Sequence, residues 1–138
     1  MFKFEKMIAW QKGIEFVDQM FDLADQLPQR YQFSLGEQLR RAALSITNNL
    51  AEGSGRRTPA LQRNFYDISK GSAYEVISIL TIAHRRNHLT DQTLQSYYAK
   101  GDEIASIISG LIDATFREEQ QNALSKRTLR EEQGEYES

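Results

Sequence analysis

The chain has 138 residues, of which 40% are hydrophobic and 26% charged, and its formal net charge is −2. This is the length of one domain, which can bury roughly 70% of the surface of its unfolded chain. The sequence has no cysteine, so disulfides and thiolate metal sites are excluded, and a reducing cytoplasmic location is expected. The first residues mix acids and amides with apolar residues, which is typical of neither a signal peptide nor a membrane span.

Positive charge is concentrated in the middle of the chain. Residues 28–86 hold nine Lys or Arg against four acids, whereas the segments on both sides are net acidic. The chain as a whole is therefore not a strongly basic polyanion binder, but it contains a modest basic region.

Four segments repeat apolar residues at alternating steps of three and four, which predicts four amphipathic helices. The first ends at Pro28, and its stripe comprises Met7, Trp10, Ile14, Val17, Phe21 and Ala24. A second apolar face carries Phe16, Met20, Leu23 and Leu27. A lone antiparallel bundle would leave this second face exposed, which favours self-association.

The second and third predicted helices have recognisable starts. Ser34 and Glu37 have the spacing of a capping box, and glycines at 53 and 55 end this helix. Its stripe comprises Leu35, Leu39, Ala42, Ile46 and Asn49. Thr58 followed by Pro59 predicts the N-cap and first residue of the third helix. The third stripe comprises Leu61, Phe65, Ile68, Ser72, Glu75, Ile79 and Ile82.

Thr90 is the predicted N-cap of a fourth helix, with the stripe Leu94, Tyr97, Gly101, Ile104, Ile108 and Leu111. No segment shows the sustained period-two alternation of strands. We therefore predict an all-α, up-down-up-down antiparallel four-helix bundle over residues 1–116. Residues 117–138 have few apolar side chains and no stripe, so a charged, poorly ordered C-terminal extension is expected, partly helical or disordered.

Several polar residues occupy positions in these stripes where apolar side chains are expected. A buried carboxylate at Glu75 would need a cation, and in a hairpin turning near Arg56 the residue Arg41 lies within one helical turn of it. An Arg41–Glu75 ion pair is therefore predicted. The full predicted structural network comprises Arg41, Ser45, Asn49, Glu52, Ser72 and Glu75. A catalytic or ligand-binding role for these residues stays open, and Gly71 is expected to permit a close helix contact.

Nucleic-acid binding would require Lys and Arg side chains gathered on one surface. The candidates are Arg40, Arg56, Arg57, Arg63, Lys70, Arg85 and Arg86. They predict one small patch at the turn between the second and third helices and another at the far end of the third. These patches indicate either ordinary solvated arginines or weak RNA or DNA binding, strengthened if an assembly repeats them.

Catalytic and metal-binding patterns are weak. His84 and His88 share a helix face near Asp91, but no further ligand is assured, so no metal site is predicted. The stretch EGSGRRT follows a helix rather than a strand and lacks the ending of a phosphate-binding loop. An enzyme is conceivable only through Glu75 or Glu52. We therefore expect no enzymatic activity, no cofactor and no small-molecule substrate.

Three motifs carry a resemblance to a known family: AWQKG at 9–13, QLRRAALSITNNLAEGSGR at 38–56 and KGSAYE at 70–75. The chain resembles the four-helix-bundle proteins encoded by intervening sequences inside 23S ribosomal RNA genes. That family is similar in turn to the accessory variability protein of diversity-generating retroelements. By matching positions, the family's characteristic residues fall on Gln38, Arg41, Ala42, Ser45, Asn49, Ala51, Glu52, Gly53, Gly71, Ser72 and Glu75.

The resemblance implies a bundle that assembles as a ring-like homopentamer in the bacterial cytoplasm, without enzymatic activity. In the retroelement relatives, a basic surface contacts nucleic acid and a reverse transcriptase. The leading hypothesis is thus a non-enzymatic oligomeric scaffold that weakly binds RNA, DNA or a nucleic-acid enzyme. The alternative is a structural or protein-partner adaptor without nucleic-acid affinity.

Overall fold

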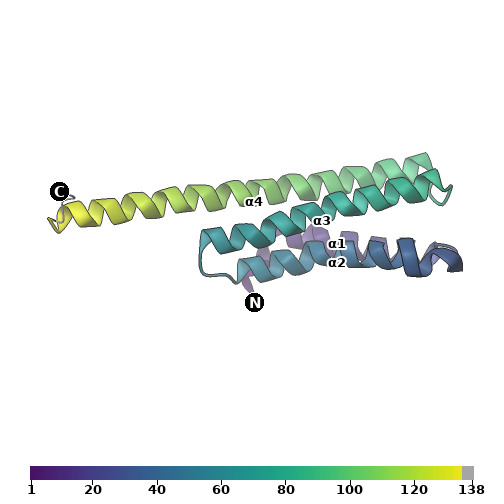
Figure 1. Cartoon of the computed structure of the whole chain (residues 1–138), viewed down its shortest axis with the longest axis horizontal. Helices are drawn as coiled ribbons and strands as arrows, with labels where there is room; N and C mark the ends of the chain where they lie inside the picture. The colour runs from purple at the N-terminus through teal and green to yellow at the C-terminus, as the bar shows by residue number, and fades with distance from the viewer. Residues whose placement is uncertain (135–138) are drawn as a thin grey trace.

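The computed structural model describes residues 1–134, which form helices joined by short turns (Figure 1). The long helices are α1 (Ile8–Gln26), α2 (Glu37–Ser54), α3 (Pro59–Arg85) and α4 (Asp91–Glu132). Short helical turns flank α1, namely η1 (Lys3–Lys6), η2 (Gln29–Tyr31) and η3 (Gln32–Gly36). The described residues contain no strand, so the all-α prediction is confirmed. None of their helices has the length and apolar character needed to cross a membrane.

The four long helices surround one core. α1 packs against α2 and α4, and α3 packs against the same two helices. Short turns reverse the chain between consecutive helices, so each helix runs antiparallel to the next (Figure 1). This arrangement is the predicted up-down-up-down bundle.

The rotation of α1 differs from the prediction. Its second apolar face is not left exposed, because Phe16, Met20, Leu23 and Leu27 are all buried, whereas Ile14 is 36% exposed. Close packing with α2 explains this orientation: a Cβ on Gly13 would lie 2.9 Å from Thr47 Cγ2. The self-association argument from α1 is therefore wrong, since the bundle itself covers that face.

α3 is also rotated relative to its predicted stripe. The residues that it buries are mainly small or aliphatic: Tyr66, Ser69, Ser72, Ala73, Val76, Ile79, Leu80 and Ala83. Leu61, Ile68 and Ile82, which were expected in the core, are instead about half exposed. Two apolar stripes overlap on this helix, and the one with small residues packs inward because it allows α2 and α4 to approach.

The predicted starts of α3 and α4 are confirmed. The hydroxyl oxygens of Thr58 and Thr90 accept hydrogen bonds from the backbone N–H groups of Leu61 and Thr93, at 3.2 and 3.1 Å. The predicted capping box at Ser34 does not form. The chain is already helical in η2 and η3 before α2, so Ser34 is not at the start of a helix. Ser34 donates to the Tyr31 carbonyl instead.

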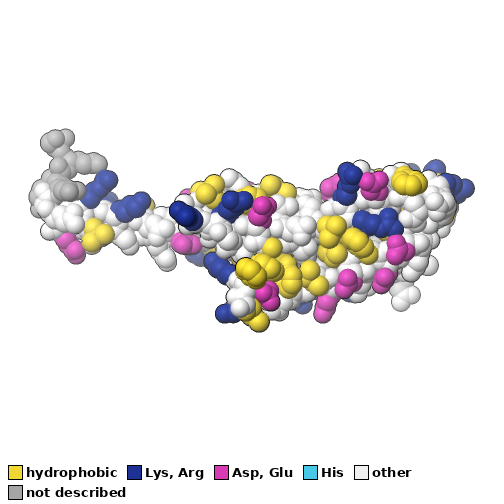
Figure 2. Space-filling model, turned by 90° about the horizontal axis from the view of Figure 1, so that it is seen from below, with side chains coloured by type: hydrophobic (Ala, Val, Ile, Leu, Met, Phe, Trp, Pro, Cys, Tyr) yellow, Lys and Arg dark blue, Asp and Glu magenta, His cyan; other side chains and the backbone are white. Residues whose placement is uncertain are grey.

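α4 continues well beyond its partners. Its residues 120–132, which we call the arm, follow the last ion pair with α3 and are exposed throughout (Figures 1 and 2). The arm is the helical part of the expected C-terminal extension and continues α4 without a break at residue 117. Residues 135–138 of that extension lie outside the described residues.

Candidate functional site

Three residues of the predicted polar network meet between α2 and α3. The hydroxyl oxygens of Ser45 and Ser72 are 2.7 Å apart, and the Asn49 amide donates to Ser45 Oγ at 3.0 Å. Ser69, which the sequence pattern did not single out, is fully buried and donates to the Ile46 carbonyl at 2.7 Å. Buried polar groups are stable when paired in this way, so the cluster fixes the register of α2 against α3.

The other three residues of the predicted network, Arg41, Glu52 and Glu75, do not join it, so this part of the prediction is wrong. Arg41 pairs with Glu37 on its own helix at 2.8 Å, and its side chain is 71% exposed. Glu52 is exposed and lies 3.4 Å from Arg56, and Glu75 is exposed as well. The register places Arg41 near the level of Glu75, but both point out of the bundle, because Ser69 and Ser72 occupy the side of α3 that faces α2.

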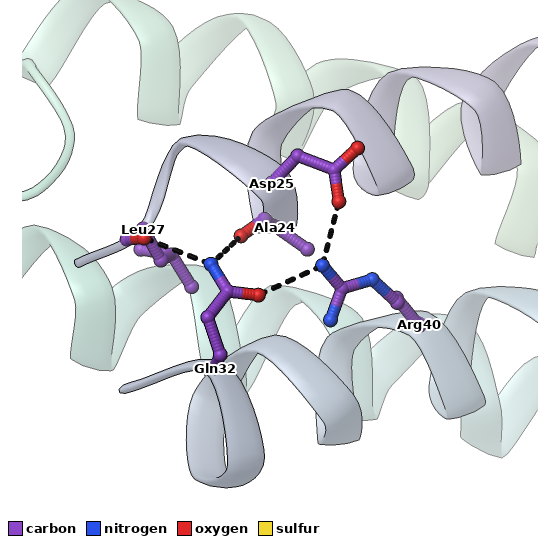
Figure 3. Close-up of polar contacts among 5 residues, drawn as sticks. All are labelled: Ala24, Asp25, Leu27, Gln32 and Arg40. Carbon is purple, nitrogen blue, oxygen red and sulfur yellow. Dashed lines mark hydrogen bonds and ion pairs between the residues drawn. The ribbon is translucent and has the colours of Figure 1, made fainter. Parts of the chain in front are cut away.

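Arg40 is a structural clamp rather than a free cation (Figure 3). Its guanidinium lies 2.7 Å from Asp25 Oδ1 on α1 and 2.9 Å from Gln32 Oε1. The Gln32 amide in turn donates to the carbonyls of Ala24 and Leu27, at 2.9 and 2.8 Å. The Ala24 carbonyl also accepts from the Leu27 backbone N–H at 3.2 Å. The Gln32 amide thus adds a partner for carbonyls in the last turn of α1, where the regular helix hydrogen bonds end, and the network ties α1 to α2.

Arg63 has a similar structural role between α3 and α4. It pairs with Glu119 at 2.7 Å, donates to Thr115 Oγ1 at 3.1 Å, and its guanidinium carbon lies 3.9 Å from the centre of the Phe116 ring. Only 17% of the Arg63 side chain is exposed. Arg63 therefore anchors α4 where the arm begins and is not available to a phosphate group.

Some of the remaining candidate cations contact aromatic rings, and others have no partner among the described residues. Arg56 stacks on Phe65 with its guanidinium carbon 4.6 Å from the ring centre, and Lys70 Nζ lies 5.8 Å from the Tyr74 ring centre. Arg57 and Arg85 are exposed and form no ion pair within residues 1–134. Each predicted patch thus retains one fully free arginine.

The patch at the α3–α4 turn also includes a residue that sequence reasoning missed. Arg30, from η2, lies over the Tyr31 ring, with 5.0 Å between the guanidinium carbon and the ring centre. Arg86 donates to the Tyr31 hydroxyl at 3.2 Å, and this hydrogen bond lowers the pKa of Tyr31. Arg30 and Arg86 are far apart in sequence, so only the fold reveals that they share a tyrosine.

The two histidines lie near this same turn. His84 contacts Asp91 at the start of α4, and His88 packs edge-on against Tyr31. Within residues 1–134, no three His, Asp or Glu side chains are grouped in a way that could hold a metal ion. These contacts connect the end of α3 to its neighbours.

One face of α3 remains exposed although it is largely apolar. Leu61, Ile68 and Ile82 are 47%, 52% and 45% exposed, and they recur every seven residues with Glu75 completing the series. Gly71 lies one turn from Ile68 and Glu75 on the same face, and a Cβ there would meet no atom within 4 Å. We call Leu61, Ile68, Gly71, Glu75 and Ile82 the outer α3 face.

The comparisons with known proteins identify the family. The model of the 23S rRNA-intervening sequence protein family matches residues 5–110. The chain belongs to this family. None of the curated proteins matches the chain. A solved structure with a similar fold is a protein of unknown function from the S23 ribosomal protein family of Bacteroides thetaiotaomicron. It has a TM-score of 0.71 and 23% identity, and the match covers 76% of this chain and 98% of that one.

The match to the family can be compared with the fold of this chain. The family match ends at residue 110, so the arm lies outside it. The motif residues on α2 and α3 divide into two groups. The buried or half-buried group comprises Ala42, Ser45, Asn49, Ala51, Gly53 and Ser72, and the exposed group comprises Gln38, Arg41, Glu52, Gly71 and Glu75.

Proposed function

We propose that this protein is a non-enzymatic scaffold that assembles through its outer α3 face. The observation that supports this proposal is the exposure of three large aliphatic side chains in one stripe, at Leu61, Ile68 and Ile82. Single exposed apolar side chains are common on soluble monomers, whereas several that recur on one face of a helix are typical of a helix that packs against a partner. A second copy that covers this stripe would bury its apolar surface, and each Å² buried stabilises the assembly by about 25 cal/mol.

Gly71 supports the same assignment. A glycine inside a helix costs roughly 1 kcal/mol relative to alanine, and close packing is the usual compensation. Among residues 1–134, no atom beyond its own stretch of the α3 backbone lies within 4 Å of the position of its Cβ, so the bundle itself offers no such compensation. A helix of a neighbouring copy, packed against Gly71 between Ile68 and Glu75, would supply it.

The assembly that we propose is the ring-like homopentamer implied by the family resemblance. In a ring, the outer α3 face of one copy meets a different surface of the next, since such contacts are head-to-tail. The ring would repeat each free arginine around its axis. The absence of cysteine supports a cytoplasmic location for this assembly.

We further propose that the assembled protein binds RNA or DNA weakly. Arg57 at one end of the bundle, and Arg30 and Arg85 at the other, are exposed and free of carboxylate partners within residues 1–134. Few cations per copy and a net charge of −2 limit the affinity of one copy, so avidity is the expected source of useful binding. A nucleic-acid enzyme such as a reverse transcriptase is the protein partner suggested by the resemblance.

The second candidate is a protein-partner adaptor without nucleic-acid affinity. The ion pairs of Arg40 and Arg63 favour it, because two of the predicted nucleic-acid-binding cations already contact carboxylates of this chain. Salt dependence separates the two candidates: binding through phosphate contacts weakens steeply as salt increases, whereas an adaptor does not bind RNA even at low salt.

Light scattering coupled to size-exclusion chromatography tests the assembly. A single chain has a mass of 15.9 kDa, so a pentamer is expected at about 80 kDa. We expect the larger particle at micromolar protein concentration. A monodisperse particle with the mass of one chain would refute the proposed assembly.

A further inference from the structure

The arm of α4 continues the helix face that carries Glu119 at the end of the bundle, and beyond the bundle this face carries Lys126 and Arg130. Lys126 and Arg130 follow Glu119 by seven and eleven residues, so at ~100° per residue both lie within about 20° of Glu119 around the helix. Glu119 contacts Arg63 of α3. Lys126 and Arg130 therefore point toward the same side as Glu119, the side on which α3 lies. At their level along α4, however, α3 is no longer present.

The arm and the α2–α3 turn together form a step at this end of the molecule. α3 begins at Pro59, only four residues from Arg63, so the bundle ends about 6 Å beyond the Arg63–Glu119 pair. Lys126 and Arg130 lie about 10 and 16 Å beyond Glu119. Figure 1 shows the arm projecting past the α2–α3 turn, and Figure 2 shows Lys and Arg side chains on its underside.

Cations line both sides of this step. Arg57 is exposed and free at the turn, where Arg56 is also exposed but pairs with Glu52 at 3.4 Å, and Lys126 and Arg130 are exposed on the arm. Arg127 pairs with Glu131 along the arm at 3.2 Å, whereas Lys126 and Arg130 form no ion pair within the described residues 1–134. The step is thus a concave basic surface formed by two segments distant in sequence.

We infer that this basic step binds the phosphate backbone of a nucleic acid, an inference that rests on the proposed nucleic-acid binding and assigns it to a surface. Free cations on two sides of a concave surface match a polyanion that lies in it. A helical partner, by contrast, would need an apolar seam on the arm. Leu124 and Leu129 are 63% and 55% exposed, but five residues separate them, so they lie about 140° apart around the helix.

Fluorescence anisotropy with a labelled double-stranded RNA, measured over a series of salt concentrations, tests the inference. In the full-length chain, the double variant Lys126→Ala/Arg130→Ala is expected to bind at least about tenfold more weakly at low salt. Its log–log salt slope should be smaller by about two, since each phosphate contact contributes roughly 0.9. Alanine is the strongest helix former, so the arm stays helical, and circular dichroism checks this.

The matched control is Lys100→Ala/Arg117→Ala, which removes the same charge from exposed positions on the same helix. Arg117 precedes Glu119 by two residues and points about 160° away from it. Retained binding in this control supports the step. Equal losses in both variants would show that affinity follows net charge alone, and this would overturn the inference.

Two other outcomes separate the inference from the proposed function. If the arm variant binds as tightly as the unmodified chain, the step is not the site, while nucleic-acid binding itself stands. If the unmodified chain binds no RNA at low salt, both the step and the proposed nucleic-acid binding are refuted. An acidic protein bound in the step instead of RNA would also contradict the inference.

Discussion

Replacing Ile68 by glutamate is expected to prevent the proposed assembly and leave a folded monomer of 15.9 kDa. Ile68 is 52% exposed in the single chain, so the carboxylate remains in water and the bundle is unaffected. In the proposed assembly the same position would be covered by another copy. Only the exposed half of the isoleucine is left to bury there, so losing its burial costs about 0.8–1.5 kcal/mol, and a buried carboxylate without a partner costs more. The dissociation constant should rise at least about 100-fold.

Light scattering and far-ultraviolet circular dichroism measure this change in mass and in helix content. Leu129→Glu is the matched control, because Leu129 is 55% exposed and lies on the arm rather than on the outer α3 face. The control should assemble like the unmodified chain. If Ile68→Glu also assembles normally, the contact between copies lies elsewhere.

Gly53→Ala is expected to lower the free energy of unfolding by about 1–2 kcal/mol, although alanine is the better helix former. Gly53 is buried near the end of α2, where a Cβ would lie 2.8 Å from Tyr66 Cε1 and 2.9 Å from Phe65 Cβ. Phe65 Cβ is attached directly to the backbone of α3, so the clash is relieved only if one helix shifts. Urea denaturation at a fixed protein concentration measures the loss.

Gly110→Ala is the matched control for Gly53→Ala. Gly110 lies inside α4 and is exposed, and a Cβ there would meet nothing within 4 Å. The same substitution should therefore raise the free energy of unfolding, by about 0.5–1 kcal/mol. Stabilisation of both variants would show that α2 and α3 are not in the close contact described above.

The sequence predicts the helices of this fold well, because their signals are local. Apolar periodicity gives four helices, and Thr58 and Thr90 mark two helix starts through contacts only three residues away. The rotation of each helix is harder to predict. α1 and α3 each carry two overlapping apolar stripes, and the choice between them depends on the fit with other helices. On α3 the stripe with Ser69, Ala73 and Val76 packs inward and Ile68 stays out.

The candidate site was only partly predictable for a related reason. The sequence marks Ser45, Asn49 and Ser72 as polar residues in an apolar pattern, and they do meet. It cannot distinguish a free arginine from a paired one. The partners of Arg40 and Arg63 are Asp25 and Glu119, on other helices.

The arm shows the limit of reading helices from apolar stripes. Residues 117–132 have no stripe, yet the helix continues to Glu132. The arm is rich in Gln, Lys, Arg, Glu and Leu, which all favour helix, and Arg127 pairs with Glu131 one turn away. Local propensity and side-chain pairing therefore extend α4 beyond the surface on which it packs.

The most direct test of the outer α3 face as a subunit contact is the labelling rate of a single thiol. The chain has no cysteine, so Ile68→Cys and Leu124→Cys each introduce a unique reactive group. In an assembled protein at micromolar concentration, the thiol at position 68 should react at least about tenfold more slowly than the thiol on the arm, because it is covered by another copy. Equal labelling rates at the two positions would contradict the proposed assembly.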